Sequence, residues 1–381
     1  MTVVSNVMDN PSAFWVVNSL FVFALSVFCA GVLIPQILLI SFRKRLFDVP
    51  DERKIHQGVV PRLGGIAFKP VVFFSVALAL GLNMLLGYGQ LLGNIGSESR
   101  PLAFGFCTII MLYLVGMADD LIGIRYRAKF AIQIICGLLV IAGGLWINNL
   151  HGLLFIHALP EWIGYPITLF AVVFIINAIN LIDGIDGLAS GLCGVAMLFY
   201  GLVFFIIGEY IYALLAFATL GVLVPFFYYN VFGDPAKKNK IFMGDTGSLT
   251  IGMMTCILSL KLLNGFPVNP SMQQPNAFFL AYSPLIIPCF DVVRVYLHRV
   301  RNGKNPFLPD KNHIHHKMLA VGMRQRTVMI AIVLVSVCFT LCNILLSRYI
   351  NVTLLLILDI FIWTLGNLWL TRRIHIAHSK L

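Results

Sequence analysis

Long apolar runs separated by short polar segments dominate the chain. Runs of 17 or more apolar residues can cross a bilayer as helices, and their continuous rather than alternating character argues against a membrane β-barrel. This pattern predicts an all-α, polytopic helical membrane bundle with about eleven transmembrane helices in a single domain covering 1–381. The expected spans are approximately 14–41, 66–87, 101–118, 130–148, 162–180, 190–207, 210–229, 246–263, 277–297, 326–346 and 351–370.

Composition supports a membrane protein and excludes an ordinary soluble domain. The 381 residues are 59% hydrophobic and 11% charged, whereas a soluble domain carries roughly 25% charged residues. The first apolar run follows no basic segment and contains Pro35, so we expect a retained anchor rather than a cleaved signal peptide. All eight cysteines lie in or beside apolar runs without a CxxC pair, which indicates small buried hydrophobes and neither disulfides nor a metal site.

Charge is distributed unevenly among the loops. The formal net charge is +11, and in a membrane protein basic loops first indicate orientation rather than a nucleic-acid partner. With eleven spans, every basic loop falls on one side, which the positive-inside rule makes cytoplasmic. This topology places the N-terminus outside and the C-terminus inside. The basic segments are 43–62, 125–129, 237–240, 298–317 and the C-terminal tail.

Five of the 16 acidic residues lie at predicted cytoplasmic span ends: Asp119, Asp120, Asp183, Asp186 and Asp245. Charged groups at membrane depth are costly and indicate function by default. Asp119 and Asp120 are adjacent carboxylates, so one binds a proton or a cation neutralises the pair. Arg125 and Lys129 follow them, which leaves two interpretations open: an interfacial salt-bridge cluster, or a site for diphosphate and Mg²⁺.

The stretch "INAINLIDGIDGL" combines amides, carboxylates and glycines. Asn177, Asn180 and Asp183 are spaced by three and would share one helix face. Asp186 follows a glycine, and glycines let a substrate approach the backbone. Helix capping explains one aspartate but not the whole stripe.

The stretch "KIFMGDTGSLTIG" places Asp245, Thr246 and Ser248 before a predicted helix, with Asn230 ending the preceding span. A glycine-flanked helix N-terminus suits phosphate, although the same residues also cap ordinary helices.

The stretch "NPFLPDKNHIHHKM" crowds three histidines into a basic loop. Zinc binding, anion binding and a surface cluster without a role are all open, and the surrounding cations favour an anion. The histidines are His313, His315 and His316, and the nearby cations are Arg299, Arg301, Lys304 and Lys311.

Together these groups predict phosphoryl transfer between a soluble nucleotide donor and a lipid acceptor at the cytoplasmic membrane face. A secondary transporter for an anionic metabolite is the main alternative, but transporters carry their ionisable residues near the bilayer midplane. Only Asp359 lies in the middle of a span, and we expect it to make a polar contact within the bundle. A scaffold with an inactive site is a third alternative, disfavoured by the intact motifs.

The four motifs, in this order, resemble the polyprenyl-phosphate N-acetylhexosamine-1-phosphate transferases, the family of MraY, WecA and TagO. The resemblance covers roughly residues 45–325 and includes a fifth stretch, "RKIHQGVVPRLGGI" at 53–66. The "HIHH" form with an upstream "PF-PD" is similar to the WecA/TagO branch.

This resemblance implies transfer of N-acetylglucosamine-1-phosphate from UDP-N-acetylglucosamine to undecaprenyl phosphate, with release of UMP. It further implies Mg²⁺, or Mn²⁺ in its place, and a multi-pass location in the bacterial inner membrane, where the product initiates a lipid-linked cell-envelope polysaccharide. The active-site loops would lie near 43–65, 119–129, 181–190, 230–248 and 298–325. Homodimerisation stays open, and no nucleic-acid partner is expected.

The resemblance also assigns roles to individual residues. Asp245 and Asn180 match metal-proximal positions, Asp186 the position that contacts uracil, and Lys129 a phosphate-binding lysine. Asp119 and Asp120 match the family's catalytic pair, which is often described as the base that prepares the lipid phosphate. A phosphate monoester is already mostly dianionic at neutral pH, so electrostatic positioning is the alternative role, and both roles stay open. The implied catalytic residues are Asp119, Asp120, Lys129, His315 and His316, and the implied substrate-binding residues are Asn177, Asp183, Asp186, Asn230, Arg301, His313 and Lys54.

Overall fold

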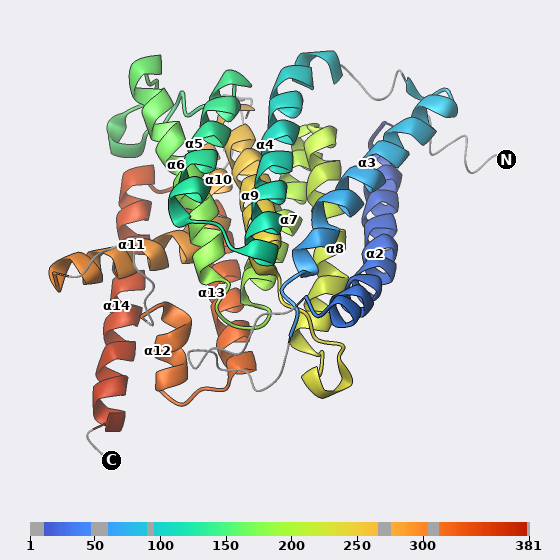
Figure 1. Cartoon of the computed structure of the whole chain (residues 1–381). Coiled ribbons are helices and arrows are strands. Elements are labelled where there is room, and N and C mark those ends of the chain that lie inside the picture. The colour runs from blue at the N-terminus through green and yellow to red at the C-terminus, as the bar shows by residue number, and fades with distance from the viewer. Residues whose placement is uncertain (1–10, 47–59, 90–94, 266–275, 304–311, 379–381) are drawn as a thin grey trace. The chain divides into compact units, whose positions relative to one another are not determined.

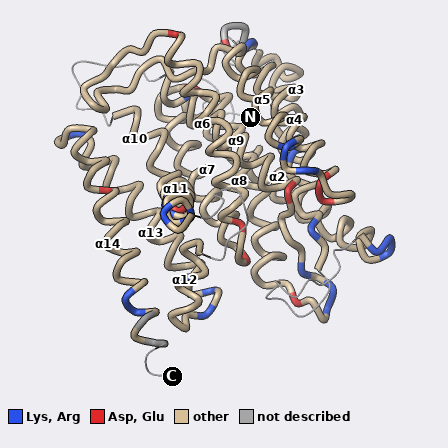
Figure 2. The backbone as a smooth tube through the Cα atoms, turned by 60° about the vertical axis from the view of Figure 1, so that its left-hand side comes forward, with Lys and Arg blue, Asp and Glu red and all other residues tan. Residues whose placement is uncertain are grey.

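A computed structural model describes residues 11–46, 60–89, 95–265, 276–303 and 312–378. Within these ranges the chain forms α-helices and short 3₁₀ turns, and the only extended pairing is an isolated bridge between Asn149 and Ala158. The all-α class is therefore confirmed. Figure 2 shows Lys, Arg, Asp and Glu mainly towards helix ends, with long uncharged stretches between them.

Ten helical segments of the described chain are long and apolar enough to cross a membrane. They coincide with ten of the eleven expected spans, so a polytopic membrane bundle is confirmed. The remaining span, expected at 130–148, corresponds to α5 (Tyr126–Ala142), a helix of 17 residues. The count of eleven and the sides of the termini stay predictions.

The chain divides into two compact units, residues 1–145 with 196–258 and residues 146–195 with 259–381. The helices α7 (Leu188–Ile207) and α9 (Gly244–Gly265) each contribute residues to both units. The expectation of a single domain stays a prediction.

The first unit is built on α2 (Pro11–Lys44), α3 (Phe68–Leu85), α4 (Ile95–Ile122), α5 and α8 (Tyr210–Val231). Helix α2 packs on α3 and α8, while α4 packs on α5 (Figure 1). A Cβ added to Gly221 would lie 2.6 Å from the Phe23 carbonyl oxygen, so α2 and α8 meet almost backbone to backbone. Small residues allow this close packing between membrane helices. The rings of Phe68 and Phe226 meet edge to face and join α3 to α8.

The second unit contains α6 (Glu161–Ile182), α10 (Ala277–Tyr282), α11 (Ile286–Arg301), α12 (Ile314–Ala320), α13 (Gln325–Leu346) and α14 (Val352–His378). The expected span at 277–297 is interrupted by a 3₁₀ turn at Ser283–Leu285. Pro284 and Pro288 lack the backbone N–H that a continuous helix needs, which accounts for the break. As a result α11 runs crosswise to α14 (Figure 1).

A buried polar pair joins the last two helices of this unit. The Asn343 side-chain amide donates a hydrogen bond to a carboxylate oxygen of Asp359 at 2.8 Å, and both side chains are buried. The prediction of a polar contact for Asp359 within the bundle is confirmed.

Candidate active site

A cluster of carboxylates and one lysine lies at the helix ends of the first unit. Asp119 and Asp120 belong to the last turn of α4, Lys129 to the first turn of α5 and Asp245 to the first turn of α9. The Lys129 ammonium lies 3.0 Å from an Asp119 oxygen and 3.4 Å from an Asp245 oxygen. Burial lowers the pKa of Lys129, but attraction to Asp245 and Asp119 outweighs it and holds the pKa above its usual value. Lys129 is therefore a fixed positive charge between two carboxylates.

The two adjacent aspartates have different partners. Asp119 accepts hydrogen bonds from the Ile124 backbone N–H and from Lys129. Asp120 accepts from the backbone N–H groups of Asp245 and Thr246, both at 2.8 Å, and from the Thr246 hydroxyl at 2.6 Å. Asp120 thus caps the N-terminus of α9 from a neighbouring helix. Thr246 contributes two of these three bonds, and the bond from its hydroxyl depends on the identity of the residue.

Glycines bring the backbones around this cluster into contact. A Cβ on Gly116 of α4 would lie 2.6–2.7 Å from backbone atoms of Asp245 and Thr246, so no larger residue fits at this crossing. The N–H groups of Gly64 and Gly65 donate to the carbonyls of Phe242 and Met243 at 3.0 and 2.9 Å. The "PRLGGI" stretch therefore holds the segment that leads into α9, which gives the fifth motif a structural role.

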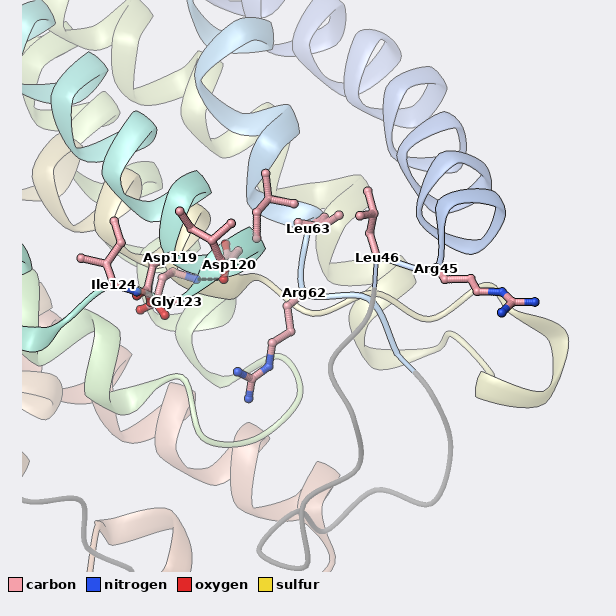
Figure 3. A pocket seen from close by; sticks show the side chains of 11 residues that line it. Arg45, Leu46, Arg62, Leu63, Asp119, Asp120, Gly123 and Ile124 are labelled. Carbon is pink, nitrogen blue, oxygen red and sulfur yellow. Dashed lines mark hydrogen bonds between the residues drawn. The ribbon is translucent and has the colours of Figure 1, made fainter.

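The cluster opens into a pocket of about 610 Å³. Figure 3 shows the carboxylates of Asp119 and Asp120 with the Arg62 side chain next to them, and Arg45 at the far end with its side chain directed away from the carboxylates. Three carboxylates and two guanidinium groups in one pocket suit a ligand that combines a divalent cation with anionic phosphates. The lining residues are Arg45, Leu46, Arg62, Leu63, Asp119, Asp120, Leu121, Ile122, Gly123, Ile124 and Asp245.

The predicted row of amides and carboxylates, Asn177, Asn180 and Asp183, lies at the C-terminal end of α6 in the second unit. Asn177 and Asn180 are half-buried on the helix, whereas Asp183 is an exposed residue just past its last turn. Only the two asparagines are therefore within the helical part of the predicted stripe. Asp186 is half-buried in the following turn, where Gly187 has a φ of +77° that other residues rarely adopt.

The histidines lie on and beside α12, in contact with this turn. The rings of His313 and His315 stack with centroids 5.7 Å apart, and the rings of His315 and His316 are 4.3 Å apart. A Cβ on Gly184 would lie 2.2 Å from Nε2 of His315, so the histidine packs directly on the glycine. The structure thus brings "HIHH" and "NLIDGIDG" together within one unit. Glycine at 184 makes room for the ring.

Burial determines the charge of the His315 ring. This side chain is 1% exposed, and neither ring nitrogen has a hydrogen-bond partner among the described residues. Burial, together with the nearby His316 and His313, lowers the pKa of His315 to about 3, so the ring is neutral at pH 7. His316 is half-buried. No group of three His, Cys, Asp or Glu side chains within the described ranges has the geometry of a metal site.

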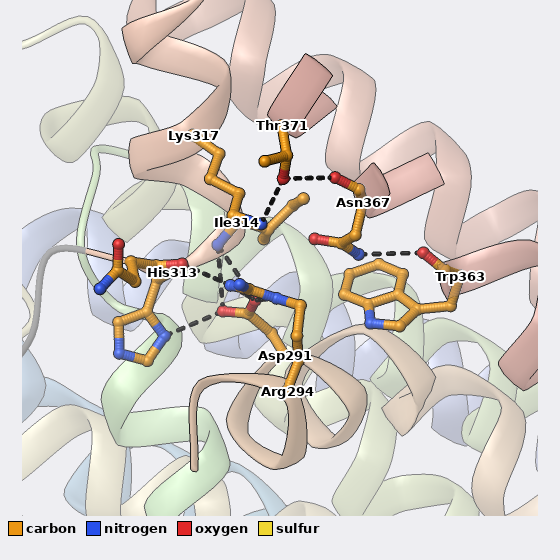
Figure 4. A network of polar contacts seen from close by, with 9 residues as sticks. Asp291, Arg294, His313, Ile314, Lys317, Trp363, Asn367 and Thr371 are labelled. Carbon is orange, nitrogen blue, oxygen red and sulfur yellow. Dashed lines mark hydrogen bonds and ion pairs between the residues drawn. The ribbon is translucent and has the colours of Figure 1, made fainter. Parts of the chain in front are cut away.

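A carboxylate that the sequence did not single out supports the histidines. Asp291 of α11 is fully buried and accepts hydrogen bonds from Nδ1 of His313 at 2.9 Å and from the Ile314 backbone N–H at 3.0 Å (Figure 4). It also forms an ion pair of 2.7 Å with Arg294. An aspartate followed by an arginine three positions later, inside a largely apolar stretch, was the available signal.

The remaining predicted residues have less informative surroundings. The buried Asn230 amide donates to the Ile241 carbonyl at 2.8 Å, so it helps to hold the segment before α9. Arg301 is exposed at the end of α11. Lys54, Lys304 and Lys311 lie outside the described residues. The metal role predicted for Asn180 rests on the resemblance alone and stays a prediction.

Comparisons with known proteins agree with this chemistry. Residues 102–263 match the model of glycosyl transferase family 4. The chain is 30% identical to the undecaprenyl-phosphate alpha-N-acetylglucosaminyl 1-phosphate transferase of Yersinia pestis, over 81% of this chain and 79% of that protein. It is 30% identical to a probable undecaprenyl-phosphate N-acetylglucosaminyl 1-phosphate transferase of Bacillus subtilis, over 89% and 88%. It is 31% identical to the Escherichia coli K12 transferase, over 76% and 74%.

The family model lies over the helices that carry the aspartate pair, Lys129 and Asp245, and the relatives extend the likeness to most of the chain. Cluster, fold and sequence therefore point to the same chemistry, and the chain belongs to the polyprenyl-phosphate sugar-1-phosphate transferases of glycosyl transferase family 4, enzymes embedded in the membrane by multiple helices.

Proposed function

We propose that the protein transfers N-acetylglucosamine-1-phosphate from UDP-N-acetylglucosamine to undecaprenyl phosphate and releases UMP. The observation that carries this proposal is the cluster in which Lys129 lies between Asp119 and Asp245 at the edge of a charged pocket. The names of the relatives support the donor and the acceptor. The reaction takes place at the cytoplasmic face of a bacterial inner membrane, and its product begins a lipid-linked cell-envelope polysaccharide.

Mg²⁺ fits the donor set of the first unit. Mg²⁺ in phosphoryl-transfer sites is held by one or two carboxylates together with substrate phosphates and water, rather than by a complete protein cage. Asp245 is the assigned ligand because Asp120 already accepts three hydrogen bonds from the start of α9. When bound, the ion would neutralise charge on the diphosphate. Mn²⁺ satisfies the same oxygen ligands.

The reaction needs positioning more than proton transfer. An oxygen of the lipid phosphate attacks the phosphorus that carries the sugar, and the bond from that phosphorus to the UMP oxygen breaks, so UMP leaves with the electron pair. The lipid phosphate is already mostly dianionic at neutral pH. Lys129 and Arg62 supply positive charge to the phosphates, Asp119 holds the Lys129 ammonium in place, and Asp120 fixes the start of α9 and therefore Asp245.

A direct assay tests this function. Purified protein is incubated with undecaprenyl phosphate, Mg²⁺ and a panel of UDP-N-acetylhexosamines, and UMP release is measured. We expect release with UDP-N-acetylglucosamine and none with the muramyl-pentapeptide donor. Equal turnover of the muramyl-pentapeptide donor would overturn the proposed donor, and absence of UMP release with every donor would overturn the reaction.

A further inference from the structure

The buried contacts of Asp291 determine which end of the His313 ring is available to a ligand. One Asp291 oxygen accepts from Nδ1 of His313 at 2.9 Å, and the other accepts from Arg294 at 2.7 Å. The Ile314 N–H is shared between them, 3.2 Å from the first oxygen and 3.0 Å from the second. Arg294 also donates a hydrogen bond to the Asn312 carbonyl, so side chains of α11 bind the residues on both sides of His313. Figure 4 shows the second ring nitrogen, Nε2, pointing away from Asp291. A carboxylate can only accept, so Nδ1 must carry a hydrogen.

The charges near the ring determine whether Nε2 carries a hydrogen or is a hydrogen-bond acceptor. The Asp291 carboxylate already has a cationic partner in Arg294, and His313 itself is 5% exposed. Among the described residues the ring has no carboxylate partner besides Asp291, so a second buried positive charge, on the ring, would be costly. Of the residues that the structure describes, Asp291 of α11 and His315 of α12 contact the ring, and Arg294, His316 and Lys317 lie close to these two groups. In the neutral ring, with its hydrogen on Nδ1, Nε2 is an acceptor.

We infer that Asp291 is a positioning residue that fixes His313 as a hydrogen-bond acceptor for an N–H group of the nucleotide-sugar donor. The donor carries two such groups, the imide of its uracil base and the acetamide of its sugar. The inference rests on the proposed function for the identity of the ligand. It changes the expected role of His313 from holding an anion to reading a polar edge of the donor.

The Asp291→Asn variant distinguishes a residue that fixes the tautomer of His313 from one that only holds the ring in place. The asparagine has the same shape, and its carbonyl can keep the contacts with the Ile314 N–H and Arg294. Its amide nitrogen then faces Nδ1 of His313 and, being a donor, requires an acceptor there. The hydrogen of the ring moves to Nε2, as in serine proteases whose triad aspartate is replaced by asparagine. The His313 ring then stays in place, but Nε2 is a donor and no longer an acceptor.

The experiment compares Asp291→Asn with three other variants of the full-length protein in detergent. His313→Asn keeps a donor near the Nδ1 position and lacks Nε2. The double variant joins the two changes. Asp359→Asn is the matched control, because Asp359 is another buried aspartate of the same unit, and its carboxylate accepts a hydrogen bond from Asn343. Kinetics of UMP release, melting temperature, and ¹⁵N spectra of histidine-labelled protein are recorded for each.

We expect Asp291→Asn to raise the KM for the donor about 10- to 100-fold, by analogy with carboxylates that orient metal-binding histidines. His313→Asn should show a similar rise, the double variant no further rise, and Asp359→Asn none. The ¹⁵N signals of His313, identified by their loss in His313→Asn, should show hydrogen on Nδ1 in the wild type and on Nε2 in Asp291→Asn.

An unchanged KM in Asp291→Asn with a shifted ¹⁵N signal overturns the acceptor role. A lowered KM does so too, because it would mean that Nε2 donates to an anion. Hydrogen on Nε2 in the wild type overturns the assigned tautomer. The ¹⁵N spectra need no turnover, so an inactive wild type would refute the proposed function while this part of the inference is still decided.

Discussion

Single residues in the aspartate cluster differ in what a substitution should do. Asp245 is the assigned Mg²⁺ ligand, so Asp245→Asn, which keeps size and removes charge, should lower kcat by roughly 100-fold or more. It should also weaken the dependence of UMP release on Mg²⁺ concentration. Asp234→Asn is the control, since Asp234 only caps a short 3₁₀ turn in the same unit. Near-normal kcat with a normal Mg²⁺ titration in Asp245→Asn would refute the assignment.

His315 makes stability depend on pH. Its folded-state pKa is lowered to about 3 from an ordinary value of 6.5, so the unfolded chain binds the proton more readily. Stability from the neutral ring is fully present above pH 6.5 and is lost as the pH falls from there towards 3, by up to about 1.4 kcal/mol per pH unit. The melting temperature of the wild type should fall more steeply between pH 6.5 and 5 than that of His315→Gln. Parallel melting curves would contradict a buried neutral imidazole.

At the scale of an element, α9 depends on a cap that another helix provides. Thr246→Val keeps the shape of the side chain but removes the hydroxyl that donates to Asp120, a loss of about 1.5–3 kcal/mol for a hydrogen bond to a charged group. We expect a lower melting temperature and slower UMP release, because the first turn of α9 carries Asp245. Thr246→Ser retains the donor and should behave like the wild type. If the valine and serine variants match, the cap does not position Asp245.

Elements were predictable from the sequence to the extent that their determinants are local. The long spans follow from continuous apolar runs, and the places of Lys129 and Asp245 at helix starts follow from the positions of their motifs beside those runs. Asp119 and Asp120 look equivalent in the sequence. Their different hydrogen-bond partners arise only where α4 packs against the starts of α5 and α9, which no local pattern reveals. Asp291 was missed since His313 lies 22 positions further along the chain. The 3₁₀ turn before α11 was not predicted, because the mean hydropathy of the span at 277–297 stays high despite Pro284 and Pro288.

For the whole molecule, loop charge predicts the orientation in the membrane. Cysteines placed at Ser99 and Gly303, in a background without the natural cysteines, should react from opposite sides. The weakly charged segment around Ser99 is expected outside and the basic segment around Gly303 inside. Labelling of intact cells with a membrane-impermeant maleimide should therefore modify Ser99→Cys and not Gly303→Cys. Equal modification of both would break the eleven-span topology.

The brevity of α5 has a consequence for the surrounding lipid. Seventeen residues at about 1.5 Å each span about 25 Å, less than the roughly 30 Å of a typical hydrocarbon core. If α5 crosses the membrane, as the loop charges require, this hydrophobic mismatch thins the bilayer beside Lys129 and draws lipid phosphates towards the reacting groups. UMP release should then be faster in vesicles of shorter-chain lipids than in thicker ones at equal fluidity. The lipid bilayer would act as a part of the acceptor site, with its thickness setting how readily a polyprenyl phosphate reaches the lysine.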